Sequence, residues 1–77
     1  MKSFDVKLTS VTDVKTFSAA AGKLDADIDV VAGRYIIDAK SIMGLFSLDL
    51  SGPVRVEVNG TDAEAESFRK SIEQFVV

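Results

Sequence analysis

The sequence lacks the residues on which several kinds of protein chemistry depend. Its 77 residues include no cysteine, no histidine, no tryptophan and a single proline. The absence of cysteine excludes disulfides and a thiolate metal site in this sequence, and a small domain without such staples is expected in the cytoplasm. The absence of histidine means that no serine has an imidazole base to activate it. We therefore expect a protein that is not an enzyme and that needs no cofactor.

Long hydrophobic runs and basic clusters are also missing. No apolar segment approaches the ~20 residues that a helix needs to span a membrane. The sequence opens at Met1-Lys2-Ser3 directly into alternating residues instead of a signal peptide. The formal net charge is −3, and no basic cluster opposes it, so polyanions are repelled. Neither a membrane nor nucleic acid is expected as a partner.

The residues that are present have the composition of one folded domain. Hydrophobic residues make up 47% and charged residues 27% of the sequence, as in ordinary globular proteins. A chain of this length forms a single domain, here residues 1–77. It buries only roughly 60% of the surface that its unfolded form exposes, which leaves little chain for a deep active site.

Apolar and polar residues alternate in four segments, which predicts four half-buried strands. In the first segment Phe4, Val6 and Leu8 lie on one face, and the residues between them lie on the other. The other segments are 26–30, 35–37 and 54–59. The second and third are separated at Ala32-Gly33 by so short a link that they form an antiparallel hairpin.

Two segments before the last strand have helical features. Ser10 begins a capping pattern, and Gly22 is a natural left-handed stop for the helix that follows. The apolar stripe of this helix consists of Val11, Val14, Phe17, Ser18 and Ala21. Residues 41–48 predict a short second helix with Leu45 and Leu48 in the core, although Gly44 costs roughly 0.5–1 kcal/mol relative to alanine.

The last segment is the clearest helix in the sequence. Thr61 and Glu64 form a capping box at its start. Its apolar stripe consists of Ala65, Phe68, Ile72, Phe75 and Val76. The element order is therefore βαββαβα, which predicts an α+β fold with one sheet covered by helices on one face.

Two short strings suggest a known family. Asp25-Ala26-Asp27 enters the second strand, and Lys40-Ser41-Ile42-Met43-Gly44 precedes Ser47-Leu48. The second string is similar to the regulatory-serine signature of the HPr phosphocarrier family of the bacterial sugar phosphotransferase system. The resemblance is direct over about half the sequence, from Leu24 onward. It implies an HPr-like open-faced β-sandwich, with a four-stranded antiparallel sheet in the order 1-4-2-3 and three helices on one face.

The start of the first helix departs from the family that the sequence resembles. HPr proteins carry a phosphate-accepting histidine there, in a G-[IL]-H-A-R-P-A type motif. The corresponding stretch here, residues 9–14, reads T-S-V-T-D-V and has no histidine, arginine or proline. Asp13 places a negative charge where a phosphate needs positive surroundings. We therefore expect that this sequence cannot carry phosphohistidine.

Ser41 is the first candidate regulatory residue. The resemblance implies that the matching serine is phosphorylated by a dedicated kinase in many Gram-positive bacteria. A phosphate at a helix start meets free amides and the positive end of the helix dipole, and Lys40 is adjacent. The structural alternative is that Ser41 only caps the helix that follows it.

The short helix after Ser41 is the candidate docking surface. Ile42, Met43 and Phe46 cannot all point inward together with Leu45, so the first three are expected to be at least partly exposed. Exposed methionine and phenylalanine suit an adaptable protein-docking patch, and the resemblance implies that this helix contacts partners. The alternatives are overspill from a small core or a contact between copies of the protein.

Two further groups of residues have weaker functional readings. Asp25, Asp27 and Asp29 lie at strand spacing and suggest a cation site, but such a row is more often a solvated strand face. Ser10 and Thr12 could replace the missing phosphate acceptor. A hydroxyl phosphate ester is too stable for a relay, so capping is the favoured role. No metal site is expected.

The sequence as a whole predicts a regulatory or adaptor protein of the bacterial cytoplasm. It would dock protein partners through the helix at 41–46, with Ser41 as its phosphorylation candidate. The resemblance implies a transcription regulator, a serine kinase or a phosphotransferase component as the partner. Two alternatives stay open, namely a phosphocarrier-type component with another acceptor and a structural or self-associating domain. The oligomeric state stays open as well.

Overall fold

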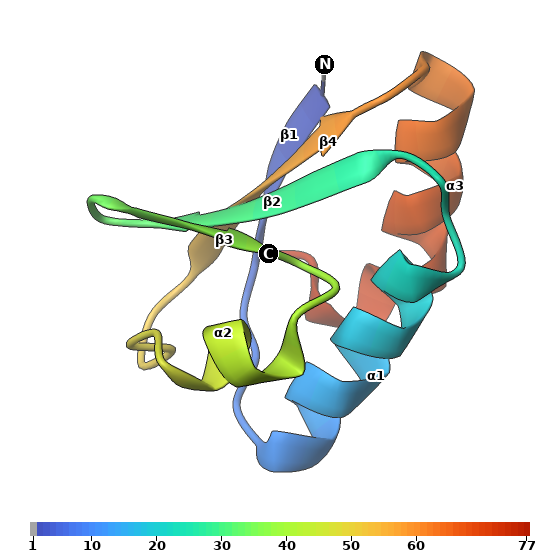
Figure 1. Ribbon diagram of the computed structural model, residues 1–77. Helices are drawn as coiled ribbons and strands as arrows, with labels where there is room; N and C mark the ends of the chain where they lie inside the picture. The colour runs from blue at the N-terminus through green and yellow to red at the C-terminus, as the bar shows by residue number, and fades with distance from the viewer. Residues whose placement is uncertain (1) are drawn as a thin grey trace.

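The structure is a computed structural model that describes residues 2–77. Four strands and three α-helices follow one another in the predicted order (Figure 1). A 3₁₀ turn, η1, comes last. The elements are β1 (Lys2–Val6), α1 (Val11–Gly22), β2 (Asp27–Ala32), β3 (Tyr35–Asp38), α2 (Ile42–Phe46), β4 (Val54–Asn59), α3 (Asp62–Ser71) and η1 (Glu73–Phe75).

The strands form one antiparallel sheet in the order β1-β4-β2-β3. The predicted fold and strand order are therefore confirmed. β2 and β3 form the expected hairpin, whose register places Ala32 opposite Tyr35. Gly33 in the two-residue loop has a φ of +61°, which is the conformation that the first position of a type II′ turn requires.

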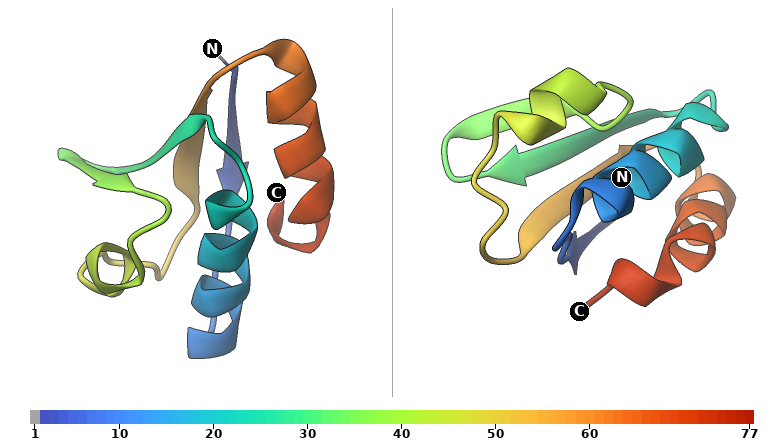
Figure 2. Two further views of the ribbon diagram at one scale, coloured as in Figure 1. Left: turned by 45° about the vertical axis from the view of Figure 1, so that its right-hand side comes forward. Right: turned by 90° about the horizontal axis from the view of Figure 1, so that it is seen from below.

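The helices cover one face of this sheet, and the other face is open (Figure 2). The core lies between the two layers, where Phe17 of α1 meets Phe68 of α3 edge to face with ring centroids 5.6 Å apart. The inner face of the sheet supplies the alternating valines and isoleucine that the sequence pattern predicts. The fully buried sheet residues are Val6, Ile28, Val30, Val56 and Val58.

The ends of α1 and α3 are set by local hydrogen bonds. Ser10 Oγ accepts from the amide of Asp13 at the start of α1, and Thr61 and Glu64 form the complete capping box of α3. The expectation for Gly22 is wrong in one respect. Gly22 is the last helical residue and has no positive φ, because α1 ends through Lys23, whose amide bonds to the carbonyls of Ala20 and Ala21.

The C-terminal segment also differs from the prediction of one continuous helix. α3 ends at Ser71, and the chain then tightens into η1, which still buries Phe75. This change of direction brings Val76 to the edge of the sheet, where it forms a bridge with Val6. The hydrogen bond from Lys7 N to Phe75 O, 2.8 Å long, holds the segment there.

None of the helices within residues 2–77 has the length and apolar character needed to cross a membrane.

Candidate functional site

The short helix α2 is fixed by a cap and by a close contact with the sheet. Ser41 Oγ accepts from Gly44 N at 3.1 Å and so begins the helix. A Cβ on Gly44 would lie only 2.6 Å from Ile37 Cγ2, so the lack of a side chain lets α2 approach β3. Leu45 is fully buried beneath the helix and Leu48 is half-buried at its end. Gly44 therefore has a packing role, whereas its helix propensity alone predicts only a cost relative to alanine.

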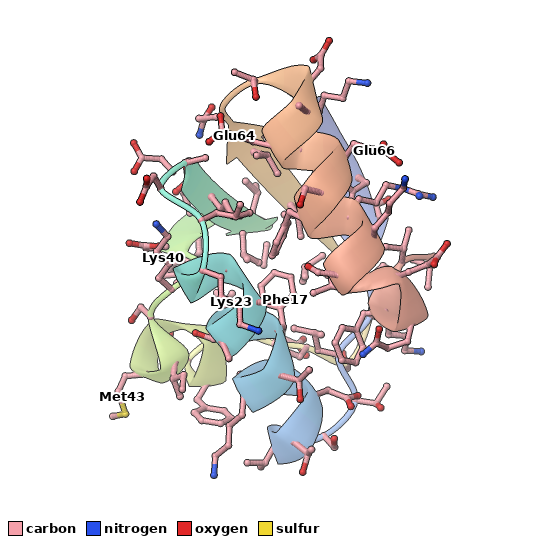
Figure 3. The ribbon with its side chains drawn as sticks, turned by 90° about the vertical axis from the view of Figure 1, so that its right-hand side faces the viewer. Phe17, Lys23, Lys40, Met43, Glu64 and Glu66 are labelled. Atoms are coloured by element: carbon pink, nitrogen blue, oxygen red, sulfur yellow. The ribbon has the colours of Figure 1, made fainter. Side chains whose placement is uncertain are left out.

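The remaining apolar side chains of α2 face outward, as expected. Ile42 is 38% exposed, Met43 82% and Phe46 43%. Figure 3 shows Met43 pointing away from the body of the protein, whereas Phe17 points into it. These side chains, Ile42, Met43 and Phe46, are called the α2 patch below. Their exposure is confirmed, and their role in docking stays a prediction.

A groove links the α2 patch to the start of α1. Its volume is about 580 Å³, and Phe46 forms part of its wall. The other lining residues are Lys7, Leu8, Thr9, Ser10, Val11, Val14, Leu50 and Ser51. Among them Val11 is 58% exposed, although the apolar stripe placed it with the core. Val11 occupies the first turn of α1 directly after the cap, and this terminal position is the signal that could have identified it as a surface residue.

The residue before the N-cap of α1 is hydrogen-bonded to a carboxylate in the first turn of the helix. Asp13 Oδ2 accepts from the Thr9 backbone amide at 3.0 Å and from the Thr9 hydroxyl at 2.9 Å. These two bonds hold the pKa of Asp13 below its ordinary value of 3.8, because both donors favour the ionised form. A negative charge therefore stays at this end of the groove at neutral pH.

Ser41 and Lys40 are both exposed, but their side chains are already engaged. The Ser41 hydroxyl caps α2, and Lys40 Nζ donates to the carbonyl of Leu24 at 2.7 Å. Lys40 N in turn donates to Asp38 Oδ1 at 2.9 Å. The loop before α2 is thus tied to both β3 and the end of α1. Ser41 remains accessible to solvent at the start of the helix.

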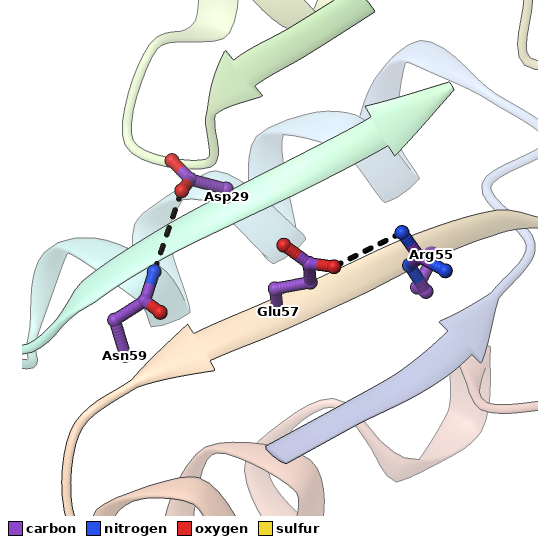
Figure 4. A network of polar contacts seen from close by, with 4 residues as sticks. All are labelled: Asp29, Arg55, Glu57 and Asn59. Carbon is purple, nitrogen blue, oxygen red and sulfur yellow. Dashed lines mark hydrogen bonds and ion pairs between the residues drawn. The ribbon is translucent and has the colours of Figure 1, made fainter. Parts of the chain in front are cut away.

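The acidic row of the second strand lies on the open face of the sheet. Asp29 accepts from Asn59 Nδ2 at 3.3 Å, and Arg55 forms an ion pair with Glu57 at 3.1 Å (Figure 4). Asp25 precedes the strand and does not belong to it. Within residues 2–77, no three acidic side chains are grouped in a way that could hold a metal ion.

Comparison with known proteins gives both a family and structural relatives. The family profile described as "PTS HPr component phosphorylation site" matches residues 12–77. HPr-C-His from Thermoanaerobacter tengcongensis is 27% identical, with a TM-score of 0.79 over 96% of this chain and 89% of that one. The histidine-containing phosphocarrier protein of a Mycoplasma shares the fold, at 18% identity and a TM-score of 0.74, over 95% of this chain and 89% of that one. No curated protein matches the chain significantly.

The profile match covers most of the chain and agrees with the element order, the sheet topology and the one-sided helical layer described above. It begins within the first turn of α1, so the loop that enters this helix lies outside it. The chain belongs to the HPr component family of the phosphotransferase system.

Proposed function

We propose that this protein is a non-catalytic adaptor of the phosphotransferase system that docks protein partners without carrying phosphohistidine. The observation that carries the proposal is the absence of histidine from a sequence that otherwise matches the HPr family over residues 12–77. The solved relatives include a protein whose name states that it contains histidine. This chain keeps their fold without that residue.

The geometry at the start of α1 supports the loss of phosphate transfer. A phosphoryl group needs hydrogen-bond donors and positive charge around it. Here the Thr9 amide and hydroxyl are both occupied by Asp13, which adds a negative charge of its own. The Ser10 hydroxyl has a different role, since its oxygen accepts from the amide of Asp13 and so caps α1. A phosphate ester on a hydroxyl there would also be too stable to act as a transfer intermediate.

The α2 patch supports the docking half of the proposal. Met43 is 82% exposed in a chain that buries Leu45 of the same helix completely. Flexible, polarizable methionine suits a surface that adapts to a partner, and Phe46 extends the patch into the groove beside α1. A partner with an apolar groove for a short helix fits this surface. A transcription regulator, a serine kinase or a phosphotransferase component of the bacterial cytoplasm is the proposed class.

Ser41 is the proposed point of regulation. Phosphorylation adds about −1.5 to −2 charge and three acceptor oxygens directly beside Ile42. A partner that offers arginine would gain charge-assisted hydrogen bonds, whereas an acidic or purely apolar groove would reject the modified helix. Modification and docking would therefore act on a single surface.

Binding to purified components of the phosphotransferase system tests the docking proposal. Met43→Ser should weaken binding of the partner at least tenfold while the melting temperature hardly moves. Val77→Ser is the matched control, because Val77 is an exposed apolar residue too, at 69%. It lies at the β1 edge of the sheet, where its amide donates to the carbonyl of Asp5. Equal effects of the two substitutions would remove the support for the α2 patch.

Incubation with ATP and the serine kinase of the HPr system tests the regulatory proposal separately. We expect label on Ser41 alone, with Ser41→Ala unlabelled. Ser47 lies at the other end of α2 and is an internal control, since its hydroxyl donates to Gly44 O at 2.6 Å. If the kinase ignores Ser41 or labels other serines equally, then Ser41 is only a helix cap.

A further inference from the structure

The two edge strands of the sheet, β1 and β3, differ in whether their outer sides are paired. The outer side of β1 is paired with the C-terminal residues, through the bridge of Val6 with Val76 and the bond from Val77 N to Asp5 O at 3.0 Å. The outer side of β3 has no strand beside it within residues 2–77. The β2–β3 hairpin also extends away from α1 and α3 (Figure 2). β3 is thus the open edge of this sheet.

The hairpin register shows which backbone groups of β3 are open. Ala32 and Tyr35 flank a two-residue loop, so they form a hydrogen-bonded pair, and the next such pair is Val30 with Ile37. The N–H and C=O of Ile36 therefore point away from β2. The Ile36 side chain is 66% exposed. β3 contains no lysine, proline or bulge to protect this edge, although the strand is short and ends at the charged Asp38.

Charges of opposite sign flank Ile36 at equal spacing. Arg34 lies two residues before it and Asp38 two residues after it. Within residues 2–77 the ion pair of the structure joins Arg55 and Glu57, so the Arg34 guanidinium is not paired. Asp38 uses Oδ1 to accept from Lys40 N, which leaves its second oxygen open.

We propose that β3 pairs antiparallel with β3 of a second copy of this chain, around a two-fold axis at Ile36. Each Ile36 would exchange both backbone bonds with Ile36 of the other copy, and the two sheets would become one continuous sheet. In this register Arg34 of each copy lies opposite Asp38 of the other. The edge is therefore complementary to itself, as an isologous interface requires.

The charge pattern selects this register among the alternatives. The open backbone groups allow shifts only in steps of two residues. Either shift would place Ile36 opposite a charged residue, Arg34 or Asp38, and would leave both opposite-charge pairs unformed. Opposite charges directly across an antiparallel pair are stabilising, and like charges are destabilising.

The length of β3 sets the strength of the association. Stable protein interfaces bury about 1,600 Å² in total, and a strand of four residues provides less. The dimer is therefore weak, forms at high protein concentration and weakens with added salt, because its ion pairs are exposed.

Charge exchange at Arg34 and Asp38 tests the proposal by sedimentation equilibrium. Arg34→Glu should weaken dimerisation roughly tenfold, and so should Asp38→Arg. The double variant should restore it to within about threefold of wild type, because both pairs re-form with reversed sign. Lys15→Glu is the matched control. It changes the net charge as much as Arg34→Glu does, but Lys15 is an exposed residue of α1, away from β3. Circular dichroism establishes that each variant is folded.

Two further measurements keep the proposal falsifiable if Asp38→Arg disturbs the loop before α2. Ile36→Lys should abolish dimerisation by placing like charges opposite each other, whereas Val77→Lys at the other edge should leave it unchanged. In a sample that mixes labelled and unlabelled protein, an intermolecular NOE should join Tyr35 Hα to Ile37 Hα, which form a non-hydrogen-bonded pair in this register. A monomer at all concentrations, dimerisation lost in Val77→Lys, or a foreign extended peptide bound without self-association would overturn the proposal.

Discussion

Gly44 of α2 packs against Ile37 of β3 so closely that a Cβ on Gly44 would lie 2.6 Å from Ile37 Cγ2. The same Cβ would lie 3.1 Å from Ser41 Oγ, the atom that caps the helix. Ile37 is branched at Cβ and partly buried, so it cannot move away freely. The position of α2, and with it the candidate docking surface, depends on this glycine.

Gly44→Ala should therefore destabilise the protein, although alanine has the better helix propensity. We expect a loss of roughly 1–3 kcal/mol in the free energy of unfolding, measured by urea denaturation, because the added methyl overpacks the contact with Ile37. Gly22→Ala is the matched control. A Cβ there meets nothing within 4 Å, so this change should stabilise by roughly 0.4–1 kcal/mol. Equal stabilisation by both substitutions would contradict the tight contact.

A series of alanine substitutions along α2 should separate the core side chain from the surface ones. Leu45→Ala should lower the free energy of unfolding by roughly 2–5 kcal/mol, since Leu45 is fully buried. Met43→Ala should change it by less than about 0.5 kcal/mol. Phe46→Ala should fall between the two, because its ring is 43% exposed and also lines the groove beside α1. A loss at Met43 equal to that at Leu45 would show that the α2 patch is core.

Asp13 should make the protein less stable as the pH falls into the acid range. Because the pKa of Asp13 is lower in the folded protein than its ordinary value of 3.8, its contribution is fully present above about pH 4. It is lost as the pH falls through the folded pKa. Asp13→Asn should lower stability at neutral pH and flatten the pH dependence in this acid range.

The side-chain donor to Asp13 can be removed separately. Thr9→Val deletes the hydroxyl but keeps the backbone amide, so the pKa of Asp13, followed by NMR, should rise toward 3.8. Asp49→Asn is a control. The pKa of Asp49 is also lowered, but by hydrogen bonds from Ser51 at another loop. If Thr9→Val leaves the pKa of Asp13 unchanged, the hydrogen bond does not control the charge at the start of α1.

The strands and the inward face of the sheet were predictable, because apolar and polar residues alternate along a strand as its side chains alternate between the buried and the exposed face. Val54, Val56 and Val58 read as an inward face, and all three are buried. The two capping patterns at Ser10 and Thr61 likewise predicted where α1 and α3 begin. The strand order came from the family resemblance, since only the β2–β3 hairpin follows from local sequence.

The errors lie where tertiary contacts override local patterns. The stripe of α3 predicted one helix through Val76, but pairing with Val6 draws the chain into η1. Val11 has the spacing of a core residue, yet it lies at the first turn of α1 and stays exposed. The importance of Gly44 depends on Ile37, a neighbour in space that the helix sequence does not reveal. The groove between α1 and Phe46 is missed for the same reason.

The intact mass of the protein after exposure to a phosphate donor tests the central claim most directly. The protein is incubated at neutral pH with phosphoenolpyruvate and the general phosphotransfer enzyme, and a histidine-containing HPr in the same tube reports that the donor is active. We predict that the mass of this chain stays unchanged while the HPr control gains one phosphoryl group. A gain of one acid-labile phosphoryl group on this chain would contradict the account, because it would show a transferable phosphate on an acceptor other than histidine.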